Sequence, residues 1–303
     1  MSLLETIILG IIQGIAEFLP ISSSGHLAIF KALFGLEDVG LTYDILLHLG
    51  TLVAVFIVYW KDIWKLIKEG IGIVIDVCRN IGRFFGNKFA KKNSPYVKIV
   101  SSAYRKFVML IIVSTIPTGI IGVIFSKIFN MDNPSLIIPG ISLLITGLML
   151  SVVDELPAGH KTPKETTYKN SLTLGIAQGI ATLPGISRSG TTLTVGVLCG
   201  LDRKFAIKYS FIMSIPAILG ACVLDLKDLF APGNAIGKTQ LTYYGIGAVV
   251  AGVVGYVCIK TLLVLFNNKK MKYFSYYCFL MGIVAIAASF ITVSYTHLTL
   301  PTT

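Results

Sequence analysis

Two short apolar segments of this chain contain side chains that can perform chemistry together. Residues 9–26 read LGIIQGIAEFLPISSSGH, with a carboxylate at Glu17, a hydroxyl at Ser23 and an imidazole at His26. Residues 174–191 read LGIAQGIATLPGISRSGT and contain an arginine between two serines. A hydroxyl or imidazole, a carboxylate and a guanidinium suit phosphoryl transfer, because that chemistry depends on positioning and on neutralising oxyanion charge. The residues therefore predict an intramembrane site for an anionic, phosphorylated and lipid-like ligand.

The two segments are copies of one internal repeat. They share 11 of 18 residues without a gap, 165 positions apart, and the identities include Gly, Gln and Ser as well as apolar residues. At three chemically important positions the copies differ: Glu17, Ser23 and His26 correspond to Thr182, Arg188 and Thr191. Repeats of this kind point to a fold with two related halves. Because the chemistry of the copies is complementary, we expect one site built between the halves.

Glu17 is the candidate catalytic or metal-binding carboxylate. It follows Gln13 by four residues, which places both side chains on one face of a helix. An ionisable group inside an apolar segment is costly and indicates function. Its expected partner is a divalent cation, Arg188 or His26. The alternative is a protonated or hydrogen-bonded Glu17 with a purely structural role.

Arg188 is the candidate phosphate ligand. A guanidinium is charged at any accessible pH and binds phosphate through two parallel hydrogen bonds. Four hydroxyls surround it in sequence, those of Ser187, Ser189, Thr191 and Thr192. The alternative is an arginine that only sets membrane topology, but its position within an apolar segment favours phosphate binding.

A serine-rich turn follows a helix break in each copy. Pro20 interrupts the first segment and the Pro184-Gly185 pair interrupts the second. Each turn, Ser22-Ser23-Ser24-Gly25 or Ser187-Arg188-Ser189-Gly190, can cap the next helix and offer N–H groups to an anion. A lone histidine such as His26 is usually structural, but its position after three serines favours a catalytic role. His48 lies deep in the following apolar segment and has no other distinguishing feature.

The composition is that of a polytopic membrane protein. Hydrophobic residues make up 54% of the chain and charged residues 14%, against about 25% charged residues in soluble domains. Runs of about 20 apolar residues can cross the bilayer. Six such spans are predicted: Asp44–Trp60, Val108–Phe125, Leu136–Val153, Ile207–Leu224, Leu241–Phe266 and Phe274–Thr292. The fold class is therefore all-α, with six transmembrane helices plus two re-entrant helical hairpins formed by the broken repeat segments.

Three spans separate the two hairpins, and an odd number predicts an inverted-topology repeat. The first repeat covers residues 1–153, with its hairpin at 1–35 and a basic cytoplasmic loop at 61–106. The second covers residues 170–292, with its hairpin at 170–200. In such folds the site lies near the membrane midplane, where broken helices of both halves meet.

The net charge of +11 is concentrated in a few loops. The stretch from Lys61 to Lys106 holds 11 of the 26 Lys and Arg residues. Nucleic-acid binding is one interpretation, but the positive-inside rule explains the pattern better, since the opposite loops near 130–135 and 225–240 are poor in basic residues. We therefore expect cytoplasmic basic loops and no nucleic-acid partner. An amphipathic run after Trp60 is expected along the inner membrane interface.

At these residues the chain resembles the bacterial undecaprenyl-diphosphate phosphatase family of the bacitracin-resistance type. That family is marked by an (E/Q)xxxE motif and a PGxSRSxxT motif, which stand here at residues 13–17 and 184–192. The resemblance covers residues 1–292. It implies hydrolysis of undecaprenyl pyrophosphate to undecaprenyl phosphate and inorganic phosphate, which recycles the cell-wall carrier lipid. It also implies a multi-pass protein of the bacterial plasma membrane with an outward-facing site.

The resemblance assigns roles by position. Ser23 is the expected nucleophile, His26 a base, acid or rival nucleophile, and Glu17 a general base or the ligand of a divalent cation, Mg or Ca. Arg188 is the expected catalytic cation of the site. The substrate-binding residues would be Gln13, Ser22, Ser24, Ser187, Ser189 and Thr192. Gln13 cannot supply a second anionic metal ligand, so Glu17 is the favoured metal residue.

Two alternatives remain open at this point. The first is a polyprenyl-phosphate transporter or flippase, because inverted repeats with broken helices are also a transporter architecture. The second concerns assembly, where a homodimer is compatible with the sequence. Residues 293–303 abandon the apolar pattern of the sixth span. We interpret them as a non-native tail without function.

Overall fold

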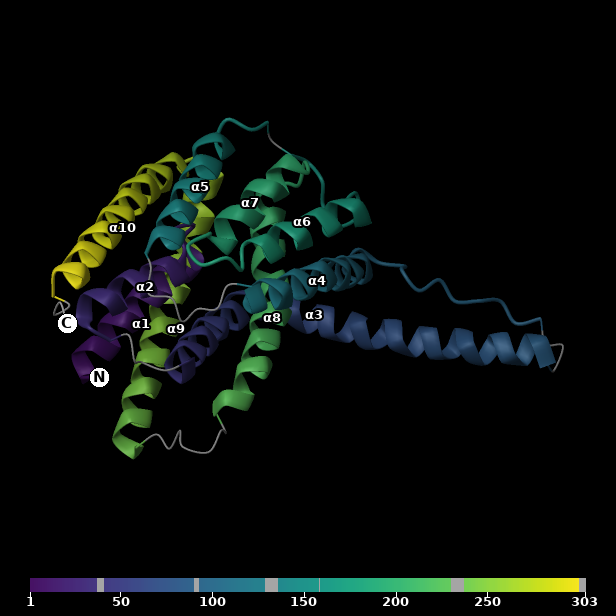
Figure 1. The fold of residues 1–303 in the computed structure, drawn as a ribbon. Coiled ribbons are helices and arrows are strands. Elements are labelled where there is room, and N and C mark those ends of the chain that lie inside the picture. Colours follow the sequence, from purple (N-terminus) through teal and green to yellow (C-terminus); the bar gives the residue numbers. More distant parts are fainter. Residues whose placement is uncertain (37–40, 90–92, 129–135, 158, 230–236, 300–303) are drawn as a thin grey trace.

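The computed structural model describes residues 1–36, 41–89, 93–128, 136–157, 159–229 and 237–299. These ranges form ten α-helices and contain no named strand (Figure 1). The helices of the first half are α1 (Leu3–Phe18), α2 (Ser23–Phe34), α3 (Leu41–Phe89), α4 (Ala103–Ile128) and α5 (Ile137–Val153). Those of the second half are α6 (Tyr168–Ile180), α7 (Arg188–Leu198), α8 (Arg203–Leu229), α9 (Lys238–Asn267) and α10 (Lys272–Thr299). The all-α prediction is confirmed.

Five helices of the described chain are long and apolar enough to cross a membrane, one fewer than the six predicted spans. They are α3, α4, α8, α9 and α10. The predicted third span corresponds to α5, an apolar helix of only 17 residues. At 1.5 Å per residue it is about 25 Å long, slightly less than the hydrocarbon thickness of about 30 Å. Residues 300–303 of the predicted tail lie outside the described residues, and the backbone before them continues α10.

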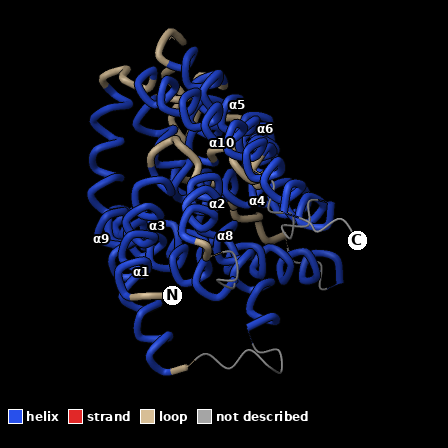
Figure 2. The backbone as a smooth tube through the Cα atoms, turned by 60° about the vertical axis from the view of Figure 1, so that its left-hand side comes forward, coloured by secondary structure: helices blue, strands red, loops and turns tan. Residues whose placement is uncertain are grey.

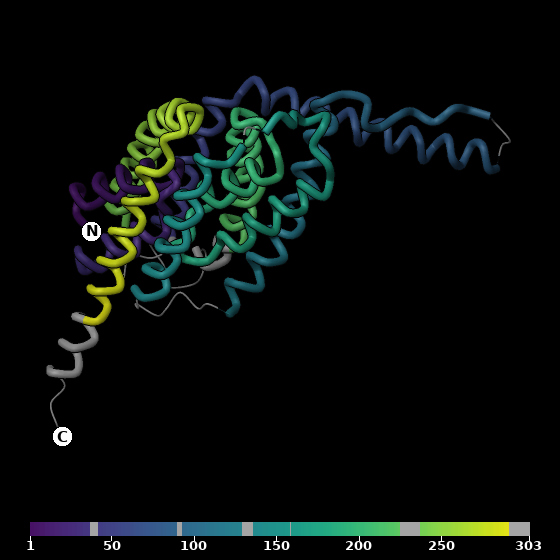
Figure 3. Tube along the Cα trace, turned by 90° about the horizontal axis from the view of Figure 1, so that it is seen from above, coloured from purple at the N-terminus to yellow at the C-terminus, as the bar shows by residue number. Residues whose placement is uncertain are grey.

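Helix α3 is bent at Tyr59, where the backbone leaves helical geometry (φ −108°, ψ 19°). The predicted first span ends within one residue of this bend. Beyond it the chain continues as a helix to Phe89, so much of the predicted basic loop 61–106 is helical. We call residues 60–89 the arm, and Figure 3 shows the arm extending sideways from the helix bundle.

An ionic cluster fixes the base of the arm against the start of α4. Arg105 donates from Nε to Glu69 at 2.9 Å and from Nη1 to Asp76 at 2.6 Å. Farther out, the side chain of Asn80 exchanges two hydrogen bonds with the backbone of Val97, each 2.8 Å long. The extended segment that returns to α4 is therefore held along the arm.

Several of the main helix contacts are repeated between the two halves. Helix α1 packs on α9, and its counterpart α6 packs on α4, the counterpart of α9. Helix α5 packs on its own counterpart α10, and α3 packs on its counterpart α8. Figures 1 and 2 both show α5 beside α10. The internal repeat of the sequence is thus accompanied by a repeat of helix contacts.

Repeated glycines permit the closest of these contacts. A Cβ on Gly10 or Gly14 of α1 would lie 2.6–2.7 Å from a backbone oxygen of α9. A Cβ on Gly175 of α6 would lie 2.2 Å from the carbonyl oxygen of Ser114 in α4, and one on Gly179 would lie 2.7 Å from Ile121. Small residues spaced by four allow helix backbones to approach in membranes. The glycines of the repeat therefore seat both broken segments against long helices.

Candidate active site

Both repeat segments break into two helices at equivalent serines. In the first copy Ser22 is the N-cap of α2, and its hydroxyl accepts the N–H of Gly25 at 3.3 Å. Ser187 does the same in the second copy and accepts the N–H of Gly190 at 3.1 Å. Such N-caps contribute about 1 kcal/mol each. Helices α2 and α7 therefore begin in the interior of the protein, where their N–H groups can face an anion.

The two breaks touch each other. The hydroxyl of Ser24 accepts the N–H of Gly185 at 3.2 Å, and in return the hydroxyl of Ser189 donates to the carbonyl of Leu19 at 3.4 Å. Gly185 has φ +89°, a left-handed conformation that favours glycine. A Cβ on it would also lie 2.4 Å from the carbonyl oxygen of Pro139. The two halves thus meet through reciprocal contacts of their equivalent turns.

Glu17 is the centre of the polar cluster at this junction. Its Oε2 accepts the hydroxyl of Ser23 at 2.6 Å and the Nε2 amide of Gln13 at 3.1 Å. Its Oε1 accepts a hydrogen bond from Nη2 of Arg188 in the other half. Nε2 of His48 lies 3.7 Å from Oε2. The carboxylate is nearly inaccessible, with 3% of its side chain exposed, whereas 19% of the Arg188 side chain is exposed.

The pairing of Glu17 with Arg188 explains how a carboxylate is tolerated in this position. A buried, unpaired charge is strongly destabilising, and a partner with several hydrogen bonds offsets most of the cost. Of the three partners expected from the sequence, the structure brings Arg188 to Glu17. The Arg188 side chain is more exposed than that of Glu17.

His26 lies in a separate hydrogen-bond group. Its Nδ1 is 2.8 Å from the carbonyl oxygen of Ser22 and its Nε2 is 2.7 Å from the hydroxyl of Tyr277 in α10. A carbonyl only accepts, so Nδ1 carries a proton, and in the neutral ring Nε2 accepts from the tyrosine. The two rings are stacked, 5.5 Å apart. Ser23 thus bonds to Glu17, while His26 bonds to Ser22 and Tyr277.

The other predicted substrate-binding hydroxyls take part in internal hydrogen bonds. Ser22 and Ser187 cap helices, and Ser24 and Ser189 join the two turns. The hydroxyl of Thr192 lies 2.6 Å from that of Ser210 in α8 and donates to the carbonyl of Arg188 at 2.9 Å. These residues build the junction, in which Ser23, Ser24 and Arg188 are half-buried.

Two neighbours of the cluster were not selected from the sequence. His48 has an ordinary apolar context in α3, and only its depth in the span distinguished it. Tyr277 stands among four other aromatic residues at the start of the predicted sixth span, and no sequence feature separates it from an interfacial anchor. Both are brought to the site by packing between distant helices.

Two side chains of the junction, Glu17 and Gln13, have oxygens of the kind that bind a divalent cation. No group of three or more His, Cys, Asp or Glu side chains with metal-binding geometry occurs among the described residues. However, Oε1 of Gln13 is buried and has no hydrogen-bond partner, and it belongs to the side chain that donates to Glu17. Mg²⁺ commonly binds one or two carboxylates and completes its shell with water and substrate phosphates. One carboxylate and one orphaned amide oxygen suit that mode of binding.

Comparison with known proteins shows the family to which the chain belongs. The chain is 40% identical to a protein of Methanosphaera stadtmanae named undecaprenyl-diphosphatase, covering 95% of this chain and 99% of the relative. A protein of the same name from Alkaliphilus metalliredigens is also 40% identical over the same shares. Undecaprenyl-diphosphatase 1 of Shouchella clausii is 37% identical, covering 94% of this chain and 95% of the relative. The family described as bacitracin resistance protein BacA matches residues 6–284, and this protein therefore belongs to that family.

Proposed function

We propose that this protein is an integral membrane phosphatase that hydrolyses undecaprenyl diphosphate to undecaprenyl phosphate and inorganic phosphate. The observation that carries the proposal is the Glu17–Arg188 pair at the junction of two helix N-termini, with the Ser23 hydroxyl bonded to the same carboxylate. This arrangement provides a base, a nucleophile and a cation for a phosphoanhydride. The relatives with this name, at 35–40% identity, support the choice of substrate.

The geometry supports a mechanism with Ser23 as nucleophile. Its hydroxyl donates to Glu17 at 2.6 Å, so Glu17 receives the proton as the serine oxygen attacks the terminal phosphorus. The bond between that phosphorus and the bridging oxygen breaks, and undecaprenyl phosphate leaves. Water then attacks the phosphoserine, releases inorganic phosphate and restores the serine.

The remaining groups neutralise charge. Arg188 exchanges its contact with Glu17 for the pyrophosphate oxygens, and the N–H groups that begin α2 and α7 add fixed positive potential. A divalent cation, Mg or Ca, held by Glu17 and the Gln13 amide oxygen, would neutralise further charge on the diphosphate. His26 is the rival nucleophile or the acid for the leaving group, with its tautomer set by Ser22 and Tyr277.

The proposed topology is an inverted repeat with six spans and two re-entrant hairpins. It is supported at one end of the bundle by Lys31, which bonds Asp44 at 2.7 Å, and by Tyr43, which donates to Thr6 at 2.6 Å. These contacts bring both ends of the α1–α2 pair beside the start of α3. A chain that enters and leaves at one end does not cross the bundle.

The proposed hairpin of α6 and α7 is supported in the same way at the other end of the bundle. Lys106 at the start of α4 lies over the ring of Tyr168 at the start of α6, 3.4 Å from its centroid. The N–H groups of His160 and Lys161 donate to Gly200, directly after α7. Both ends of the α6–α7 pair therefore lie near the base of the basic arm. By the positive-inside rule this end is cytoplasmic, and the site opens to the opposite side.

Release of phosphate by the detergent-solubilised protein tests the proposed function. The purified protein is given undecaprenyl diphosphate, and phosphate is measured with Glu17→Gln beside the matched control Glu155→Gln, whose carboxylate is exposed. We expect the parent and the Glu155→Gln control to hydrolyse the substrate, and Glu17→Gln to release almost no phosphate. The transporter alternative is favoured by the helix contacts that are repeated between the halves. Transport, however, is observed only between two compartments. Absence of phosphate release from a folded preparation, with lipid movement in vesicles, would establish the transporter instead.

A further inference from the structure

One side of the arm is an apolar surface that the described chain leaves uncovered. Seven of its large apolar side chains are each more than half exposed: Trp60, Trp64, Ile71, Val74, Ile81, Phe85 and Phe89. They follow one another at intervals of three, four or seven residues, which places them on one side of a helix. At 1.5 Å per residue this side is about 45 Å long. We call these seven residues the apolar stripe.

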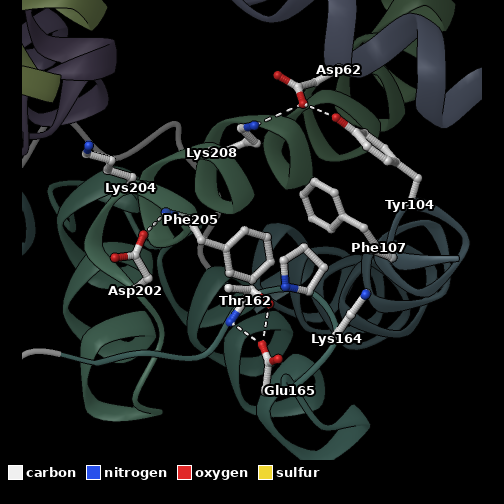
Figure 4. Close-up of a pocket in the computed structure, with 12 residues that line it drawn as sticks. Asp62, Tyr104, Phe107, Thr162, Lys164, Glu165, Asp202, Lys204, Phe205 and Lys208 are labelled. Carbon is white, nitrogen blue, oxygen red and sulfur yellow. Dashed lines mark hydrogen bonds and ion pairs between the residues drawn. The ribbon is translucent and has the colours of Figure 1, made fainter.

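The opposite side of the arm is polar and is covered near its base. Asp62 and Glu69 each precede a residue of the apolar stripe by two positions, which is about 200° of helical rotation. Asp62 accepts the hydroxyl of Tyr104 at 2.8 Å (Figure 4). Glu69 and Asp76 both bind Arg105. All three acids of the arm are therefore used in contacts with the start of α4.

Farther out, the same polar side is covered by the extended segment of residues 93–102. The side chains of Asn80, Arg83 and Asn87 form hydrogen bonds with backbone atoms of residues 94–97. Figure 1 shows this segment running above the arm. The arm therefore has one side whose polar groups are satisfied within the protein and one apolar side that is exposed.

Three lysines border the apolar stripe and have no acid partner. Lys61, Lys68 and Lys88 are exposed, and none of them forms an ion pair with another described residue. Their Nζ atoms lie 5.7, 5.2 and 5.9 Å, respectively, from the ring centroids of Trp60, Trp64 and Phe89. A long lysine stem covers apolar surface while its ammonium group stays in a polar layer. The stripe thus has a positive border.

The position of the arm brings the apolar stripe to the membrane interface. The arm begins at the Tyr59 bend, where the predicted first span ends, and Figure 3 shows it extending sideways from the bundle. A helix with this direction, starting at the end of a span, runs along the bilayer surface and does not cross it. Large exposed apolar patches mark sites of membrane or protein contact.

Charge distinguishes between the two partners that could cover such a stripe. A second copy of this chain would place stripe against stripe and bring the positive borders together, and like charges repel. An acidic lipid surface brings the opposite charge, and each lysine near it contributes about 1 kcal/mol. Amphipathic helices with aromatic and aliphatic residues on one face and basic residues beside them bind membranes in this way. The positive border therefore favours acidic phospholipid.

We propose that the arm binds the acidic phospholipid surface of the bilayer, with the apolar stripe among the acyl chains and Lys61, Lys68 and Lys88 at the headgroup phosphates. This extends the interfacial run expected after Trp60 as far as Phe89 and gives it a partner of defined charge. The returning segment keeps the polar side of the arm satisfied while the stripe lies in lipid. The binding is separate from the proposed hydrolysis, because no residue of the arm belongs to the candidate active site.

Tryptophan fluorescence of the full-length protein in vesicles tests the proposal, because both tryptophans of the chain lie on the apolar stripe. In the background Trp60→Phe/Trp64→Phe, a single reporter is placed either on the stripe, as Phe85→Trp, or on the returning segment, as the matched control Tyr96→Trp. Both positions are more than half exposed. The vesicles contain phosphatidylcholine brominated in its acyl chains, diluted with phosphatidylglycerol. Phe85→Trp should be quenched by the bromine and emit at shorter wavelength, whereas Tyr96→Trp should keep its fluorescence.

The charge of the lipid is tested with the same stripe reporter. Phe85→Trp should be quenched more strongly in vesicles with phosphatidylglycerol than in vesicles of phosphatidylcholine alone. The double variant Lys68→Gln/Lys88→Gln should lose most of this difference, since the lysines supply the attraction to acidic headgroups. The matched double variant Lys169→Gln/Lys270→Gln, which removes the same charge from exposed positions outside the arm, should retain it.

Three results would overturn the proposal: equal quenching of the two reporters, no difference between the two lipid mixtures, or equal losses in the two double variants. Cys78 is exposed on the side of the stripe and reports on the alternative of a second copy. Oxidative cross-linking of Cys78 between two copies, without lipid quenching of Phe85→Trp, would establish a dimer contact instead. Circular dichroism and thermal midpoints verify that each variant is folded, so that a negative result counts against the proposal.

Discussion

Glu17 of the first half and Arg188 of the second form an ion pair in the protein interior although they are 171 residues apart in sequence. Each residue replaces a different side chain in the opposite copy of the repeat: Glu17 corresponds to Thr182, and Arg188 corresponds to Ser23. The junction is therefore symmetric in its backbone and asymmetric in its charge. Neither half contains both members of the pair.

Arg188→Lys should lose about two orders of magnitude in phosphate release, because an ammonium cannot form the planar two-point contact of a guanidinium. The measurement compares purified variants at matched thermal stability. Arg79→Lys on the exposed arm is the control and should keep parental activity. Near-parental activity of Arg188→Lys would mean that charge alone suffices.

Glu17→Gln should fold and be nearly inactive, whereas Gln13→Ala should keep appreciable activity. Glu17 carries the negative charge of the cluster, and Gln13 donates a single hydrogen bond to it. Titration with Mg²⁺ and Ca²⁺ distinguishes the roles: Gln13→Ala is expected to need more cation, because the orphaned amide oxygen is removed. Parental rate and cation dependence in Glu17→Gln would make the carboxylate structural.

Tyr277→Phe should reduce activity through His26 and have no further effect when His26 is already alanine. The phenol hydroxyl is the partner of Nε2, and its loss frees the ring nitrogen while Ser22 still holds Nδ1. The pH profile of kcat/KM should therefore shift in Tyr277→Phe and not in the exposed neighbour Tyr276→Phe. Independent, multiplying losses in the double variant would show that Tyr277 acts by another route.

Gly175→Ala should destabilise the protein, with an overpacking cost of about 1–3 kcal/mol. The new Cβ would lie 2.2 Å from the carbonyl oxygen of Ser114, which belongs to the α4 backbone and cannot move freely. Gly119→Ala on the same α4 is the control, because its Cβ would meet no atom within 4 Å. The thermal midpoint in detergent measures both, and equal midpoints would refute close packing of α6 on α4.

Much of this architecture could be predicted from the sequence because the repeat is visible in it. Hydropathy indicated the helical membrane class, and the identical Gly and Ser positions marked the two breaks. An amphipathic run after Trp60 was expected, but its extent to Phe89 as a continuation of α3 and the bend at Tyr59 were not evident, because the basic residues of this stretch also suit a loop. The bounds of α5 were predicted to within one residue, at Leu136–Val153 against Ile137–Val153, but its 17 residues are fewer than a full bilayer span of about 20 residues needs.

The site was predicted in part for a similar reason. Residue type and burial in an apolar segment were enough to select Glu17 and Arg188. The partners of Ser23 and His26 were not predictable, because the local sequence does not decide which distant helix each side chain meets. Tyr277 of α10 reaches His26 of α2 because both helices pack on α5.

The central claim is that the two halves share one catalytic unit. A double-mutant cycle on Glu17 and Arg188 tests it most directly. Phosphate release is measured for Glu17→Gln, Arg188→Met and the double variant, with thermal midpoints as the folding control. Residues that act as a unit show strongly non-additive losses. We predict that the double variant is little worse than the poorer single variant, and that its midpoint exceeds that of Arg188→Met, since no unpaired buried carboxylate remains. Losses that multiply, with additive changes in midpoint, would contradict a shared unit.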